Sequence, residues 1–114
     1  MKLLVCGGSK YQDREALFRC LDELHSRTPL TLIINGGARG ADYLASAWAK
    51  ERGIALKVFK ADHKNFGVDA FMELNAAMLE ATQPDLVLAF PGGIITADMQ
   101  ARAKTACIPV TIMR

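Results

Sequence analysis

Two glycine-rich stretches, each directly after an apolar run, contain the residues whose types and spacing could do chemistry. "NGGARGAD" at 35–42 follows "LTLII", and "FPGGIITADM" at 90–99 follows a second apolar run. Glycine lets backbone N–H groups approach a ligand without an intervening Cβ, and a helix beginning at such a turn presents unpaired donors with a positive dipole end. The two stretches therefore predict sites for an anionic group, above all a phosphate.

Two charged side chains in the first stretch fit this chemistry. Arg39 adds a planar set of donors that matches phosphate geometry, and Asp42 could hold that arginine or accept from a ribose hydroxyl. The alternative is structural, because glycine-rich turns are common in α/β domains, Asp42 can simply start a helix, and Arg39 can be solvated. The two best-known phosphate-binding patterns, Gly-x-Gly-x-x-Gly and Gly-x-x-x-x-Gly-Lys-Ser/Thr, do not match.

Alternating strand and helix patterns position these loops at one edge of a sheet. Five strands, each buried on both faces, are predicted at "KLLVC", "LTLII", "ALKVF", "DLVLAF" and "IPVTIM", with helical apolar spacing between them. The alternation predicts one α/β domain over residues 1–114: a Rossmann-like, doubly wound parallel five-stranded sheet of order 3-2-1-4-5 with four main helices. Residues 60–69 are expected to be irregular. Ligands bind at the carboxyl ends of such strands, where both stretches and a third, "CGGSKYQD", converge.

The composition excludes several classes of function. The 14 Lys and Arg residues barely exceed the 12 Asp and Glu and are scattered along the chain, so nucleic acid is a weak candidate for a partner. Cys6, Cys20 and Cys107 are far apart among apolar neighbours, which predicts reduced core thiols and a cytoplasmic location. No run resembles a signal peptide or reaches membrane-spanning length, so we expect no membrane contact. His25, expected at the carboxyl end of the first helix, and His63 predict no metal site, and we expect no cofactor.

Five motifs, in this order and spacing, resemble the YspA-related branch of the SLOG superfamily: "VCGGSKYQD", "NGGARGAD", "ADHKNFG", "LNAAM" and "AFPGGIITADM". The resemblance covers nearly the whole chain and extends distantly to the LOG phosphoribohydrolases and the DNA-processing Smf/DprA proteins. It implies a Rossmann-like domain that binds a nucleotide or an ADP-ribose-like small molecule. The residues that match the family pattern are Gly7, Gly8, Gly36, Gly37, Arg39, Gly40, Asp42, Asn75, Pro91, Gly92, Gly93, Thr96 and Asp98.

Candidate ligand-binding residues follow from the loops and the resemblance together. They are Gly7, Gly8, Ser9, Tyr11, Asp13, Gly36, Gly37, Ala38, Arg39, Gly40, Asp42, Asn75, Pro91, Gly92, Gly93 and Thr96. Asp13 caps the first helix or accepts a ligand hydroxyl, and Tyr11 stacks on a base, as the family pattern suggests, or covers the helix start. Asn75 lies among apolar residues, where an unpaired amide would cost on the order of 1 to 3 kcal/mol, so it should have a partner.

Three departures from the family pattern bear on mechanism. Ile95 stands where the branch usually has glycine, and its branched Cβ makes a positive φ costly. Leu74 and Met99 stand at the positions of an arginine and a glutamate of the LOG enzymes. In those enzymes the two residues look like the groups that cleave the N-glycosidic bond. Asp98 is then the only nearby carboxylate and the sole catalytic candidate. We therefore favour binding, as a sensor or processing protein; the alternative is a nucleoside 5′-monophosphate phosphoribohydrolase, and a DNA-processing role ranks third.

The segment "DAFMELNAAMLEA" at 69–81 predicts a helix that is apolar around most of its circumference. Only Glu73 and Glu80 form a narrow polar strip. Because one sheet cannot cover such a helix, we expect a homodimer that forms through residues 69–81. The alternative is that small alanines and a flexible methionine are simply exposed.

Overall fold

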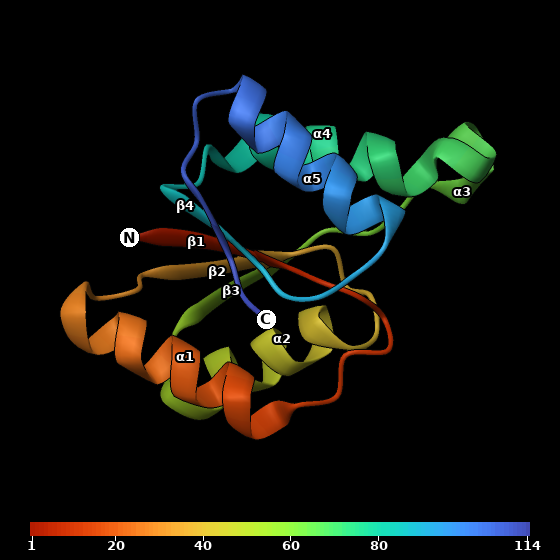
Figure 1. Ribbon diagram of the computed structural model, residues 1–114. Coiled ribbons are helices and arrows are strands. Elements are labelled where there is room, and N and C mark those ends of the chain that lie inside the picture. The colour runs from red at the N-terminus through yellow and green to blue at the C-terminus, as the bar shows by residue number, and fades with distance from the viewer.

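A five-stranded sheet forms the centre of the computed structural model, which describes residues 1–114 (Figure 1). The strands are β1 (Lys2–Cys6), β2 (Leu32–Asn35), β3 (Ala55–Val58), β4 (Leu86–Ala89) and β5 (Val110–Ile112). Their order is β3-β2-β1-β4-β5, and every neighbouring pair is parallel. The predicted fold class and strand order are confirmed.

Helices cover both faces of this sheet, as Figure 1 shows. On one face lie α1 (Arg14–Arg27) and α2 (Ala41–Arg52), and on the other lie α4 (Ala70–Thr82) and α5 (Ile94–Thr105). The prediction that residues 60–69 are irregular is wrong, because α3 (His63–Phe66) and the 3₁₀ turn η1 (Gly67–Asp69) occupy most of this stretch. Asp62 starts α3 by accepting a hydrogen bond from the amide of Asn65 at 3.1 Å.

The strands are buried on both faces only in the middle of the sheet. Leu3 and Leu4 of β1 are both fully buried, Leu3 against α1 and α2 and Leu4 in the core under α4 and α5. Val58 of β3 is 49% exposed and Ile112 of β5 is 60% exposed. The expectation of burial on both faces is therefore wrong for the two edge strands, because the paired helices cover the centre of the sheet.

The three cysteines are free, as predicted, but they are not all core residues. Cys6 is buried, Cys20 is half-buried and Cys107 is exposed. Cys107 adopts a left-handed backbone conformation, with φ of 60°, in the turn that follows α5. The prediction of a core thiol is wrong at this position because the turn lies at the surface.

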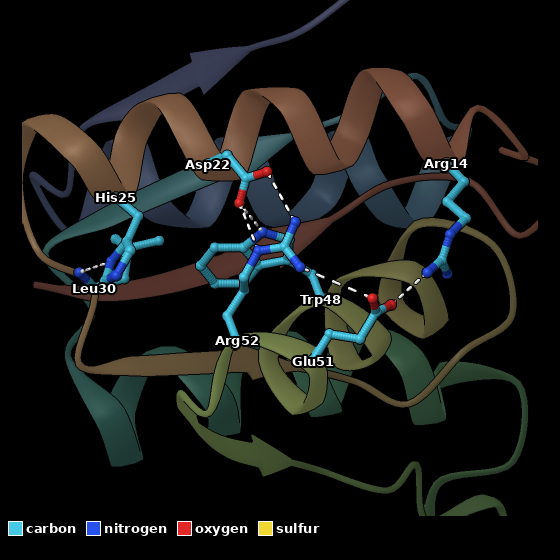
Figure 2. A network of polar contacts seen from close by, with 7 residues as sticks. All are labelled: Arg14, Asp22, His25, Leu30, Trp48, Glu51 and Arg52. Carbon is cyan, nitrogen blue, oxygen red and sulfur yellow. Dashed lines mark hydrogen bonds and ion pairs between the residues drawn. The ribbon is translucent and has the colours of Figure 1, made fainter.

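A polar network joins α1 to α2 away from the glycine loops (Figure 2). Trp48 is fully buried, and its indole N–H donates to Asp22 at 2.8 Å, while Arg52 donates twice to the same carboxylate at 2.9 Å. His25 accepts a hydrogen bond from the amide of Leu30 through Nδ1 at 2.9 Å and packs edge-on against Trp48. His25 lies in the last turn of α1, as expected, and also holds the loop that leads into β2.

The helix α4 has two neighbours within the chain. Its buried side chains Leu74, Met78 and Leu79 pack in the core beside the sheet, and α5 lies against α4 (Figure 1). Phe71 and Met72 remain half-buried. The sheet and α5 therefore cover only part of the apolar circumference of this helix.

None of the helices has the length and apolar character needed to cross a membrane.

Candidate ligand-binding site

A cavity of about 340 Å³ opens at the carboxyl edge of the sheet. Its walls come from four segments: the end of β1 and the loop after it, the loop between β2 and α2, one face of α4, and the start of α5. The strand order reverses between β1 and β4, and the crevice at such a switch point is where ligands of open α/β sheets bind.

The structure gathers most of the predicted ligand-binding residues around this opening. Those that line the cavity are Gly7, Gly8, Ser9, Gly36, Ala38, Asp42, Asn75, Gly93 and Thr96. Tyr11, Asp13, Pro91 and Gly92 line a neighbouring, more open hollow of about 610 Å³. Gly37, Arg39 and Gly40 line neither space, and neither does Asp98.

Several glycines serve the contact between the loops. The amide of Gly8 donates to the carbonyl of Pro91 at 2.8 Å, which joins the loop after β1 to the loop after β4. Gly40 has φ of 78°, and a Cβ at this position would collide with the carbonyl of Gly8. At Gly92 a Cβ would come within 2.6 Å of the amide nitrogen of Gly8. These two positions need glycine for packing of the chain itself.

Three amides of the loop between β2 and α2 are already hydrogen-bonded within the chain. Oδ2 of Asp42 accepts from the amides of Gly36 and Ala38, each at 3.2 Å, and Oδ1 of Asn35 accepts from the amide of Gly37 at 2.8 Å. The carboxylate of Asp42 thus occupies the position that a phosphate on this loop would need. It does not hold the exposed Arg39 in an ion pair.

The start of α5 has free amides, unlike these three positions of the loop. Gly93 is the N-cap residue and supplies no side-chain hydrogen bond, and the first helical bond runs from the amide of Ala97 to the carbonyl of Gly93. The amides of Ile94, Ile95 and Thr96 therefore have no acceptor in the chain, and all three residues line the cavity. The helix dipole adds a partial positive charge at this end, so the start of α5 can receive an anion.

Ile95 fits this arrangement without strain. It is the second residue of α5 and has no positive φ, so the expected cost of a branched Cβ does not arise. The side chain is 37% exposed beside the opening.

Asn75 and Asp98 form a contact between α4 and α5. The side-chain amide of Asn75 donates to the carbonyl of Ile95 and to Oδ2 of Asp98, each at 3.0 Å, which confirms that this asparagine has a partner. Arg102 donates to the same oxygen of Asp98 at 2.8 Å. The three side chains fix the first turns of α5 against α4 and thereby position the free amides at the cavity.

Asp13 is an N-cap residue, since its side chain accepts a hydrogen bond from the amide of Ala16 at 3.0 Å. The ring of Tyr11 packs against the ring of Phe90, with centroids 5.1 Å apart. The capping role predicted for Asp13 is therefore confirmed. Tyr11 packs on Phe90, and its contact with a base stays a prediction.

Burial affects the electrostatics of the cavity. Burial raises the pKa of Asp42 to about 6, although the amides of Ala38 and Gly36 act in the opposite direction. Burial, with a contribution from the charge of Asp42, raises the pKa of Cys6 to about 12, so its thiol stays protonated and is a poor nucleophile. No Lys, Arg or His lines the cavity. The lining thus combines one carboxylate with one positive helix terminus.

Comparison with known proteins supports the predicted family. The model of the YspA, cpYpsA-related SLOG family matches residues 1–66, more than half of the chain. The chain belongs to this family. The Gene 61 protein of Mycobacterium phage D29 is 36% identical over an alignment 118 positions long, which covers 96% of this chain and 93% of that protein. Membership of the SLOG family suggests a role in binding or processing a nucleotide-related ligand.

The matched segment of this SLOG protein includes the loops after β1 and β2, while α4 and α5 lie beyond it. Sequence reasoning missed the apolar walls of the cavity, which are Val5, Cys6, Phe71, Leu74, Met78, Ile94 and Ile95. Helical spacing from Asn75 could have identified two of these residues. Phe71 and Met78 lie four residues before and three residues after Asn75, on the same face of the helix.

Proposed function

We propose that this SLOG protein binds a nucleotide or a nucleotide-derived ligand in the cavity, with a phosphate group at the start of α5. The observation that carries the proposal is the set of three unpaired amides of Ile94, Ile95 and Thr96 beside the cavity. Backbone N–H groups at a helix start bind phosphate through direct hydrogen bonds and the helix dipole. A volume of about 340 Å³ is within the range of small-molecule sites.

The lining also limits the charge of the ligand. Because no cationic side chain lines the cavity, the three amides have to balance the phosphate by themselves, which favours one phosphate over a triphosphate. A longer ADP-ribose-like ligand would extend into the neighbouring hollow, which shares Gly8, Ser9 and Gly93 with the cavity.

The binding proposal is tested by replacing the helix cap. Gly93→Asp introduces a carboxylate at the N-cap, where a Cβ meets nothing within 4 Å. An N-cap aspartate accepts from the free amides and repels a phosphate, so the variant should stay folded and lose nucleotide affinity by about 10- to 100-fold. Gly93→Ala is the matched control and should keep the affinity within a few-fold.

Isothermal titration calorimetry and thermal melting with a panel of nucleoside monophosphates and ADP-ribose give the readout. A ligand at 100 times its dissociation constant should stabilise the protein by about 2.7 kcal/mol. Binding that is equal in wild type and Gly93→Asp would move the phosphate away from α5. Absence of binding across the whole panel at millimolar concentration would overturn the proposal.

Hydrolysis has less support in the geometry than binding. Asp98 does not line the cavity, and its Oδ2 accepts from both Asn75 and Arg102. Leu74 and Met99, at the positions where LOG enzymes have charged residues, are both buried in the core. Incubation with nucleoside 5′-monophosphates followed by chromatography should therefore release no free base. Release that Asp98→Asn abolishes would instead favour a phosphoribohydrolase.

A further inference from the structure

Asp42 presents an unpartnered carboxylate oxygen in the lining of the cavity. Both of its hydrogen bonds engage Oδ2, and none reaches Oδ1. The residue is only 7% exposed, yet no fully enclosed side-chain polar atom of the chain lacks a partner. Oδ1 must therefore touch accessible space, and the space that Asp42 lines is the cavity. A nearly buried acceptor without a donor is unfavourable, and a donor on a ligand would satisfy it.

Apolar side chains lie near the carboxylate of Asp42. A Cβ built at Gly36 would lie 3.1 Å from Cδ2 of Leu74, 3.5 Å from Cε of Met78 and 3.4 Å from Oδ2 of Asp42, so these side chains converge on one place. The protonated thiol of Cys6 lies in the same lining. A sugar here would place several hydroxyl groups against apolar walls. The faces of a planar base suit such walls, and only the edge of the base needs a polar partner.

We propose that Asp42 is a specificity-determining residue that selects ligands whose base carries an amino group, with the amino N–H donating to Oδ1. The inference rests on the proposed nucleotide-binding function and adds the chemical class of the base. Because Oδ2 already accepts two amides, Oδ1 is the oxygen that reads the base. A keto oxygen at the same position would face the carboxylate oxygen and be repelled.

The decisive measurement compares purine ligands that differ in one group. Calorimetry at about pH 8, where the carboxylate of Asp42 is ionised, uses adenosine 5′-monophosphate, the analogue without the 6-amino group, and inosine 5′-monophosphate. Loss of the amino group should weaken binding to wild type by about 10- to 100-fold, as expected for a hydrogen bond to a charged group. The 2′-deoxy analogue should bind within a few-fold of the parent, because the donor is on the base and not on the ribose.

Asp42→Asn offers a second readout. The carbonyl oxygen of the new side chain can keep the amides of Gly36 and Ala38, and its NH₂ group then faces the cavity as a donor. The preference should therefore reverse, from the amino-substituted to the keto-substituted purine. Asp85→Asn is the matched control, because it removes the same charge at the opposite edge of the sheet, where Asp85 accepts from the amide of Lys2 at 2.7 Å. This control should retain the amino preference.

The outcomes separate the two proposals. If wild type binds none of the nucleotides, the proposed function fails and the inference fails with it. If wild type binds them with equal affinity, or if only the 2′-deoxy analogue binds weakly, nucleotide binding stands and the role of Asp42 in reading the base is overturned. Should Asp42→Asn not fold, the comparison of the three purines on wild type still decides the matter.

Discussion

The raised pKa of Asp42 makes the stability of the protein depend on pH in a calculable way. Burial raises this pKa from 3.8 to about 6 against the effect of two amide hydrogen bonds. The folded state then holds the proton more tightly than the unfolded chain, so the free energy of unfolding rises as pH falls through 6 toward 3.8. With these two pKa values, Asp42 contributes on the order of 1 kcal/mol more stability at about pH 5 than at about pH 7.

Urea unfolding of wild type and Asp42→Asn at the two pH values measures this contribution. Other carboxylates titrate as well: arginine and the Trp48 indole lower the pKa of Asp22, whose contribution is lost as pH falls, in the opposite direction. These contributions are common to both proteins and cancel in the comparison. Wild type should therefore gain on the order of 1 kcal/mol more than Asp42→Asn on going from about pH 7 to about pH 5.

Two results would refute this reasoning. Equal pH dependence of the two proteins would mean that Asp42 titrates in the folded state as it does in the unfolded chain. A larger gain in Asp42→Asn would mean that the hydrogen bonds from Gly36 and Ala38 outweigh the cost of burial. An NMR titration of the Asp42 carboxyl carbon locates the midpoint directly, and it should lie near pH 6.

Three further predictions concern the stability of the fold and the assembly of the chain. Asp22→Leu leaves the indole N–H of the buried Trp48 without its acceptor and should lower the free energy of urea unfolding by about 1 to 3 kcal/mol. Asp22→Asn keeps an acceptor and should lower it by less. Equal losses in the two variants would assign the effect to charge alone. Gly40→Ala should lower the melting temperature, because the new Cβ meets the carbonyl of Gly8 at a positive φ, and an unchanged melting temperature would show that the loop can yield. We propose that the chain forms a homodimer through residues 69–81, where Met72 is half-buried. Light scattering should show a dimer for wild type and a monomer for Met72→Asp. A wild-type mass near 12.4 kDa would contradict the proposal.

The order of the strands and the edge that carries the loops could be predicted from the sequence. Apolar strands alternate with amphipathic segments, and right-handed crossovers leave few arrangements of a parallel sheet. Because the carboxyl ends of parallel strands share one edge, glycines that follow β1, β2 and β4 had to converge. Local rules also predicted the cap by Asp13 and the need of Asn75 for a partner.

The pairing of donors and acceptors across the loops was decided only by the tertiary structure. From the sequence, the loop at 35–42 and the loop at 90–99 offered similar amides for a phosphate. In the fold, the carboxylate of Asp42 comes within 3.2 Å of two amides in the first loop, while the start of α5 keeps three without an acceptor. Sequence spacing does not specify such distances, because they depend on where the following helix packs.

The burial of α4 likewise depends partly on the sequence and partly on the tertiary structure. Its wide apolar surface could be read from residues 69–81, since helical periodicity is a local property. That α5 covers part of this surface, and that Phe71, Leu74 and Met78 line a cavity, depends on the approach of segments about 20 residues apart. The sequence by itself determined which surfaces were apolar and which loops were open, and only the packing of helices on the sheet decided which of them faced a cavity.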